Sequence, residues 1–128
     1  MSGADLDLNA SITEIDRCMI VTLSDNMTDD RLAEISGIII QKAHERSIRG
    51  AVLNFGMVSL VDSYIYKVFA DTSRALSLFG VRVVWVGLSP GVVCAMIDLG
   101  IEPDETVIRT ALNLEQGLSC LSAAAASV

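Results

Sequence analysis

Two short, continuously apolar segments, separated by one amphipathic helix, constrain the fold of this chain most strongly. Residues 50–55 and 81–87 consist mostly of apolar residues, and each contains a single polar side chain. Strands of this kind are buried on both faces, as in parallel sheets. Between them, residues 62–79 repeat apolar side chains with a helical period, and Gly80 follows as a helix stop. The sequence therefore predicts a β-α-β crossover on a parallel sheet.

The flanking segments extend this unit on both sides. Residues 11–15 and 18–23 alternate loosely and predict a β-hairpin, and residues 28–46 predict a helix that begins at a Thr28 cap. The later elements are a helix from Ser89-Pro90 to Gly100, a short strand at 106–109, and a last helix capped by Asn113 and Gln116. The order of elements predicts an α/β fold, with a mixed β-sheet, parallel crossovers and about four helices.

Length and hydrophobic content set the domain organisation. With 128 residues, 52% of them hydrophobic, the chain can bury one sizeable core. We expect a single domain over residues 1–128, with a core of about 8–122 and a tail, 123–128, that frays. The apolar runs are far shorter than the ~18 residues of a membrane span, and no basic leader precedes them, so we expect a cytoplasmic protein without a membrane partner. The high hydrophobic content also predicts self-association, at least as a dimer.

Charge and reactive residues argue against several function classes. The net charge is −7, with Lys and Arg scattered along the sequence, so we expect no nucleic-acid partner. Cys18, Cys94 and Cys120 lack the paired spacing of a zinc site or a redox dithiol, and His44 is the single histidine. The chain also lacks the common nucleotide-binding, hydrolase and metalloprotease motifs. We therefore expect no enzyme, no cofactor and no metal.

The tripeptide Val61-Asp62-Ser63 is the best candidate for a functional motif. It places Asp62 as the cap of the second helix and Ser63 on its first turn, where backbone N–H groups are unpaired and the helix dipole favours negative charge. A phosphate on Ser63 would meet a prepared site, while Asp62 would make the added charge repulsive. The alternative is that Ser63 simply begins a helix. The sequence makes Ser63 a candidate phosphorylation site.

Other polar residues near this point are candidates for binding a partner. In open α/β sheets ligands gather beyond the carboxyl ends of the strands, where the helix starting at Ser89 also begins, although Ser89 can equally be an ordinary cap. Tyr64 and Tyr66 fit the inner stripe of their helix poorly, and tyrosine is enriched at interfaces. Phe79 and Trp85 are expected in the core instead. The predicted partner-binding set is Asp62, Ser63, Tyr64, Tyr66 and Ser89.

The motifs of residues 51–93 resemble those of a known family. A strand, the Val61-Asp62-Ser63 helix start, Gly80, a second strand, then Gly87 and Pro90 are similar to the STAS domain of anti-sigma factor antagonists. Within that superfamily, VDSYI (61–65), LFGV (78–81) and VGLSPGVV (86–93) are most similar to RsbS-type scaffold subunits of the stressosome. The resemblance covers roughly residues 8–122 and implies a STAS-like fold.

The resemblance also implies a function. In that family the serine at the position of Ser63 is phosphorylated by an RsbT-like serine kinase, which the unmodified protein holds in a large assembly with RsbR-like STAS paralogues. Those paralogues carry a phosphorylatable threonine in the following helix, whereas residues 91–100 here contain no hydroxyl side chain. Two alternatives remain open: a free-standing antagonist that binds an anti-sigma factor directly, and a small-anion or nucleotide-binding module that uses the two helix N-termini.

Overall fold

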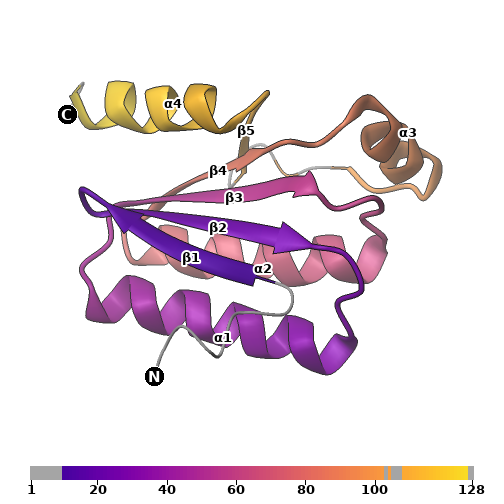
Figure 1. Ribbon diagram of the computed structural model, residues 1–128, viewed down its shortest axis with the longest axis horizontal. Coiled ribbons are helices and arrows are strands. Elements are labelled where there is room, and N and C mark those ends of the chain that lie inside the picture. The colour runs from indigo at the N-terminus through magenta and orange to yellow at the C-terminus, as the bar shows by residue number, and fades with distance from the viewer. Residues whose placement is uncertain (1–9, 103, 105–107, 127–128) are drawn as a thin grey trace.

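The computed structural model describes residues 10–102, 104 and 108–126 (Figure 1). Its strands form one five-stranded sheet in the order β1-β2-β3-β4-β5, in which β1 and β2 are antiparallel and the other pairs are parallel. The predicted α/β fold with a mixed sheet and parallel crossovers is confirmed. The elements are β1 (Ala10–Ile15), β2 (Cys18–Ser24), α1 (Asp29–Glu45), β3 (Gly50–Met57), α2 (Ser63–Leu78), β4 (Arg82–Val86), α3 (Pro90–Asp98), β5 (Arg109–Ala111) and α4 (Leu114–Ala126).

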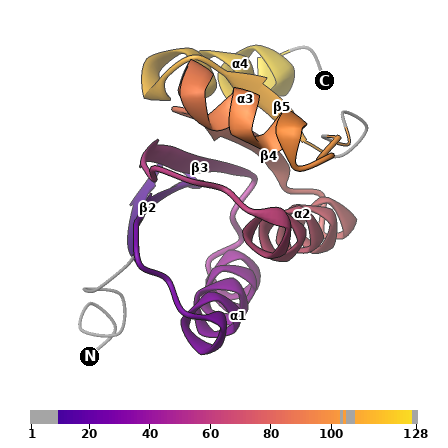
Figure 2. The ribbon, with the colours of Figure 1, turned by 90° about the vertical axis from the view of Figure 1, so that its right-hand side faces the viewer.

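The helices cover the sheet in two unequal layers (Figure 2). Helices α1 and α2 pack on one face and α4 on the other, while α3 lies beyond the end of the strands. The larger core is between the sheet and α1 and α2, and it holds Leu53, Phe55 and Phe69 almost without solvent exposure. On the other face, a Cβ on Gly117 would lie 2.7 Å from a Val86 methyl carbon, so glycine lets α4 approach the sheet closely.

The helix boundaries follow the predicted capping residues. Thr28, Asp62, Ser89 and Asn113 each accept a hydrogen bond from the backbone N–H three residues later, at 2.8 to 3.2 Å. These bonds satisfy donors that a helix leaves unpaired at its start. Gly80, with φ +84°, follows α2 in the left-handed conformation that glycine adopts without strain. Local chemistry therefore determines where α2 begins and ends.

Trp85 fixes α2 against the sheet. Its indole Nε1–H donates to Ser73 Oγ at 3.0 Å, and the Ser73 hydroxyl donates in turn to the Phe69 carbonyl oxygen at 2.7 Å. The ring centroid of Trp85 lies 4.7 Å from that of Phe55. The predicted burial of Trp85 is confirmed, with its polar atom satisfied inside the core.

Three details differ from the predictions. Phe79 was expected on the inner stripe of α2, but it is 52% exposed: it is the residue that caps the end of α2, and its ring lies beside His44 instead. The last strand is Arg109–Ala111 rather than 106–109, of which 106 and 107 lie outside the described residues. Helix α4 continues to Ala126, so residues 123–126 of the expected tail are helical, and 127–128 lie outside the described residues.

Candidate functional site

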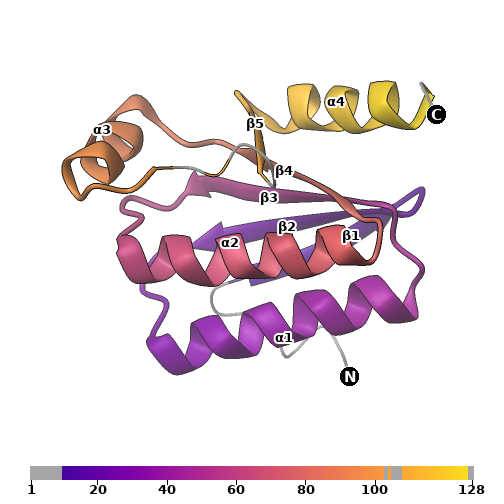
Figure 3. The same ribbon diagram turned by 180° about the vertical axis from the view of Figure 1, so that it is seen from behind.

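The carboxyl ends of β2, β3 and β4 meet at one edge of the sheet, which we call the carboxyl edge. The loops that leave these strands, residues 25–28, 58–62 and 87–89, lead into the first turns of α1, α2 and α3. Figure 3 shows α1 and α2 beginning at the end of the molecule where α3 lies. The topology therefore brings Asp62, Ser63 and Tyr64 to the same edge as Ser89.

Ser63 is exposed on the first turn of α2. Asp62 caps the helix and accepts the Ile65 N–H at 2.8 Å, and within the described part of the chain the N–H groups of Ser63 and Tyr64 have no hydrogen-bond partner. These free N–H groups and the helix dipole favour an anion at this position, whereas the Asp62 carboxylate repels one. The Ser63 hydroxyl is thus accessible to a kinase. The electrostatic energy of a phosphate at this position would depend on the helix N-terminus, which attracts it, and on Asp62, which repels it.

A buttress that the sequence did not reveal supports the loop before Ser63. Asp25, which follows β2, accepts the Ser59 N–H at 2.8 Å and the Ser59 hydroxyl at 2.5 Å. These two hydrogen bonds hold the pKa of Asp25 below its ordinary value, because they favour the charged carboxylate. The residues are 34 positions apart. The sequence signal that could have indicated this contact is that Asp25 and Ser59 each follow a predicted strand, and that these two strands are neighbours in the sheet.

Gly87 brings the loop after β4 into contact with the end of β3. It has φ +81°, and a Cβ at this position would lie 2.6 Å from the backbone nitrogen of Gly56. The Gly56 N–H is itself held by Asn54 Oδ1 at 2.9 Å. Glycine is therefore required at position 87 for both its backbone conformation and its close approach to the end of β3, which leads into the loop before Ser63.

The two tyrosines of α2 differ in their surroundings. Tyr64 is 45% exposed at the carboxyl edge. Tyr66 is half-buried, and its hydroxyl accepts the Asp104 N–H at 3.0 Å and donates to the Glu102 carbonyl at 3.4 Å. Tyr66 thus braces the segment after α3, which leaves Tyr64 as the tyrosine better placed to contact a partner. The exposed Ser89 also has a structural task, since its Oγ caps α3.

Exposed apolar side chains surround these polar residues. Met57 at the end of β3 is 68% exposed, Leu60 on the loop that leads to Ser63 is 50% exposed, and Ile97 of α3 is 65% exposed. Apolar groups of this size at the surface, next to a polar centre, are typical of a protein interface. They were not predicted, because residues in a loop or at the end of a short strand or helix give no clear periodic pattern.

The carboxyl edge is acidic. Asp29 and Asp30 lie on the first turn of α1, Asp98 ends α3 and Glu102 follows it. Among the described residues, no group of three or more His, Cys, Asp or Glu side chains is arranged to hold a metal ion. None of the helices in the described ranges is long and apolar enough to cross a membrane.

Solved structures with the same fold cover nearly all of this chain. Moorella thermoacetica RsbS, as a variant with one serine replaced by glutamate, is 24% identical, with a TM-score of 0.78 over 91% of this chain and 97% of that one. A chain of the stressosome, described as a signal integration and transduction hub, is 25% identical, with a TM-score of 0.75 over 89% and 97%. Unphosphorylated SpoIIAA, an anti-sigma factor antagonist, is 16% identical, with a TM-score of 0.69 over 89% and 96%.

Comparison with protein families gives a direct assignment. Among curated proteins, none matches the chain. The model of the STAS domain matches residues 9–116, which include all five strands of the sheet, all of α1 to α3, and the start of α4. The predicted resemblance is therefore confirmed, and this chain belongs to the STAS domain family.

Proposed function

We propose that this protein is a phosphorylation-regulated scaffold and antagonist of a stress-response signalling complex of the stressosome type, which sequesters an RsbT-like serine kinase until Ser63 is phosphorylated. The observation that carries the proposal is the exposed Ser63 hydroxyl at the start of α2, directly after the Asp62 cap. In this proposal the protein is the substrate of a kinase rather than a catalyst, and it acts in the cytoplasm.

The solved relatives support a serine switch in this fold. RsbS was solved as a variant in which glutamate replaces a serine, and SpoIIAA was solved in both unphosphorylated and phosphorylated forms. The similarity to a stressosome chain supports a role in a large assembly, in which we propose an RsbR-like paralogue as the second subunit. The motifs VDSYI and VGLSPGVV, on which the RsbS-type resemblance rests, contain Ser63 and Gly87 and support the proposal.

The proposed switch acts on the partner's surface. A phosphate adds about −1.5 to −2 charges at neutral pH, and the free N–H groups at the start of α2 can accept it locally. A kinase that binds the unmodified edge meets a neutral hydroxyl together with Tyr64 and Leu60, both exposed. After phosphorylation the kinase would meet a desolvated dianion next to Asp62. The partner is released while the fold is kept.

The test is to map the modification. Incubation with the cognate RsbT-like kinase and ATP should place one phosphate on Ser63, detected by mass spectrometry of the intact chain and of its peptides. Ser63→Ala should lose this phosphate, whereas Ser59→Ala and Ser89→Ala, the matched hydroxyl deletions at the same edge, should keep it. Undiminished phosphorylation of Ser63→Ala would refute the assignment.

A second candidate is a free-standing antagonist that captures an anti-sigma factor directly. SpoIIAA, an anti-sigma factor antagonist, has the same fold at 16% identity, and the Asp62-Ser63 helix start is common to both candidates. Size separates the two candidates: a scaffold should co-assemble with an RsbR-like paralogue into a particle of megadalton scale. An antagonist should stay small after mixing and should bind the anti-sigma factor instead.

A further inference from the structure

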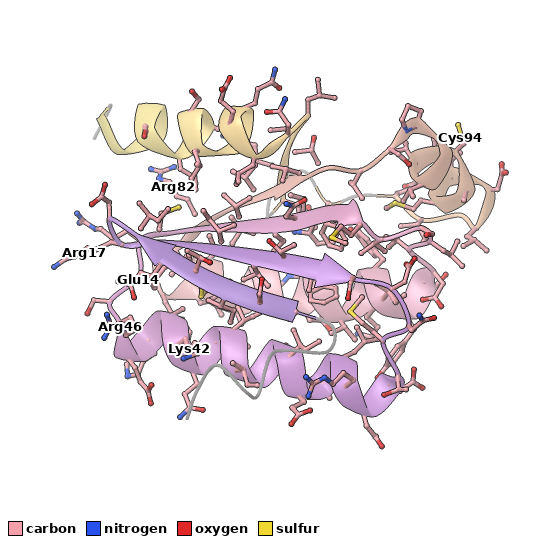
Figure 4. The ribbon with its side chains drawn as sticks, in the orientation of Figure 1. Glu14, Arg17, Lys42, Arg46, Arg82 and Cys94 are labelled. Atoms are coloured by element: carbon pink, nitrogen blue, oxygen red, sulfur yellow. The ribbon has the colours of Figure 1, made fainter. Side chains whose placement is uncertain are left out.

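Positive side chains gather at the end of the molecule opposite the carboxyl edge. We call this end, where the parallel strands begin, the amino edge (Figure 4). Because its cations come from separate turns and helix ends, they look scattered in the sequence. They are five of the nine Lys and Arg residues of the chain: Arg17 between β1 and β2, Lys42 and Arg46 at the end of α1, Arg49 before β3, and Arg82 at the start of β4.

Three of these arginines lie on adjacent backbone segments. The Arg49 N–H donates to the Arg17 carbonyl at 2.8 Å, and the Arg82 N–H donates to the Arg49 carbonyl at 3.0 Å. Neighbouring strands are roughly 5 Å apart, so three exposed guanidinium groups start from backbone positions within about one Debye length of physiological salt. Within the described ranges, none of the three has a carboxylate partner.

The amino edge also contains carboxylates, but fewer of them. Arg46 Nε lies 2.8 Å from Glu14 Oε1, and this hydrogen bond raises the pKa of Arg46. Among the described residues, Asp16 and Glu45 complete the acidic groups of this edge. Within this part of the chain, five cations therefore face three carboxylates, although the net charge of the whole sequence is −7. The amino edge is the positive end of a polar molecule.

Exposed apolar side chains accompany the charges at both ends. At the amino edge these are Phe79, Leu78 and Ile15, and Phe79 contacts the His44 ring at the end of α1. At the carboxyl edge they are Met57, Leu60, Tyr64 and Ile97. Each end thus combines apolar groups with charge, and the two ends differ in the sign of that charge. The apolar groups can provide buried area, and the charges can orient the partners.

We propose that the amino edge of one copy binds the carboxyl edge of a second copy. Guanidinium groups pair with carboxylates in a two-pronged geometry, and Asp30, Asp98 and Glu102 present exposed carboxylates without a partner in the described part of the chain. Repulsion between two anionic chains is screened beyond roughly 8 Å at physiological salt, so the facing edges determine the interaction.

The geometry determines how such an assembly grows. The two edges lie at opposite ends of the parallel strands, so the contact joins different surfaces of the two copies and leaves one edge free at each end. Contacts of this type extend by addition of further copies. Ser63 lies on the edge that a second copy covers, so the kinase and the second copy compete for it. Only this competition rests on the proposed function, because self-association is measured without kinase.

Sedimentation velocity of the purified chain, at increasing protein concentration in 50 and 500 mM NaCl, tests the proposal. The average mass should rise with concentration beyond that of two copies at low salt, and the apparent association constant should fall at least tenfold at high salt. A basic-edge variant, Arg17→Glu/Arg49→Glu/Arg82→Glu, and an acidic-edge variant, Asp30→Lys/Asp98→Lys/Glu102→Lys, should each associate at least tenfold more weakly than wild type.

Mixing the two variants provides the decisive comparison. Each variant alone presents two edges of the same sign and should not associate with itself. In an equimolar mixture, both the two unreversed edges and the two reversed edges are opposite in charge, so the mixture should regain association with alternating copies of the two variants. The control Lys67→Glu/Arg74→Glu/Arg109→Glu has the charge change of the basic-edge variant at other exposed positions, and should associate within about twofold of wild type.

Three results would overturn the proposal. The first is a wild-type chain that remains a single copy at several hundred micromolar in 50 mM NaCl. The second is association that both edge variants retain, which would indicate a different interface, such as a two-fold one. The third is equal weakening by the control variant, which would indicate a general effect of net charge. Circular dichroism and thermal melting of each variant exclude loss of the fold as the cause.

Discussion

The two edges of the sheet differ in how they are built as well as in charge. At the carboxyl edge, segments that follow different strands are fixed to one another. Asp25 accepts two hydrogen bonds from Ser59, and Gly87 packs against Gly56 at the end of β3. At the amino edge, backbone hydrogen bonds from Arg49 to Arg17 and from Arg82 to Arg49 join the turns, and exposed side chains such as Phe79 and Arg82 project from them. A rigid edge can hold a modifiable serine in one geometry, whereas the other edge presents charge on long side chains.

The largest difference in loss of stability is expected between alanine substitutions at two glycines with similar backbone conformations. Gly87 has φ +81° and Gly80 has φ +84°, but a Cβ at Gly87 would meet the Gly56 backbone, whereas one at Gly80 meets nothing within 4 Å. Left-handed φ costs alanine about 1–2 kcal/mol, and overpacking adds about 1–3 kcal/mol. Gly87→Ala should therefore lower the free energy of unfolding by about 2–5 kcal/mol, and Gly80→Ala by about 1–2 kcal/mol. Urea denaturation measures both, and equal losses would show that the loop contact is unimportant.

A smaller difference in loss of stability is expected between truncations of two apolar side chains, one at each edge. Val61 is fully buried beside the site, whereas Phe79 is 52% exposed. Val61→Ala should cost about 1–3 kcal/mol of stability, because it leaves a cavity, and Phe79→Ala less than about 1 kcal/mol despite the larger deletion. Denaturation midpoints of the two variants compare them. A greater loss for Phe79→Ala would mean that the amino edge is packed more tightly than described here.

The smallest effect concerns pH at the carboxyl edge. The pKa of Asp25 is lowered in the folded chain, so its contribution to stability is complete above the ordinary aspartate pKa of about 3.9 and is lost as the pH falls through the lower, folded value. The Ser59 amide should therefore titrate with an apparent pKa below about 3.9 in NMR spectra, and Asp25→Asn should remove that transition. A titration midpoint at or above the ordinary aspartate pKa would contradict the hydrogen bonds between Asp25 and Ser59.

Much of the fold was predictable because it depends on local patterns. The inner stripe of α1, Leu32, Ile35, Ile39 and Ala43, is buried as its spacing predicts, and the caps Thr28, Asp62 and Ser89 begin their helices where expected. Phe79 was misplaced because the helical period was extended by one residue into the cap, where the backbone no longer follows the helix. Short strands near uncertain turns, such as β5, give too few residues to establish a period.

The candidate site was predictable only in part. The helix start at Ser63 is encoded in adjacent residues, so it could be read directly. The Asp25–Ser59 buttress, the tyrosine contacts of Tyr66 with residues 102 and 104, and the cluster of arginines at the amino edge depend on segments that are distant in sequence. Such pairs become visible only once the strand order is known, because neighbouring strands decide which loops and turns meet.

The central claim is that a change of charge at Ser63 is felt by the partner at the carboxyl edge and not by the fold. Binding of Ser63→Asp to the RsbT-like kinase, compared with wild type and with the matched control Ser89→Asp at the same edge, tests it most directly. Loss of one buried polar contact costs about 2–5 kcal/mol, which corresponds to roughly 30-fold or greater weakening. Ser63→Asp should show weakening toward the lower end of this range, because it carries one charge, with a melting temperature within a few degrees of wild type. Ser89→Asp, which retains a capping side chain, should bind within about threefold. Wild-type affinity for Ser63→Asp, or unfolding of that variant, would contradict the account.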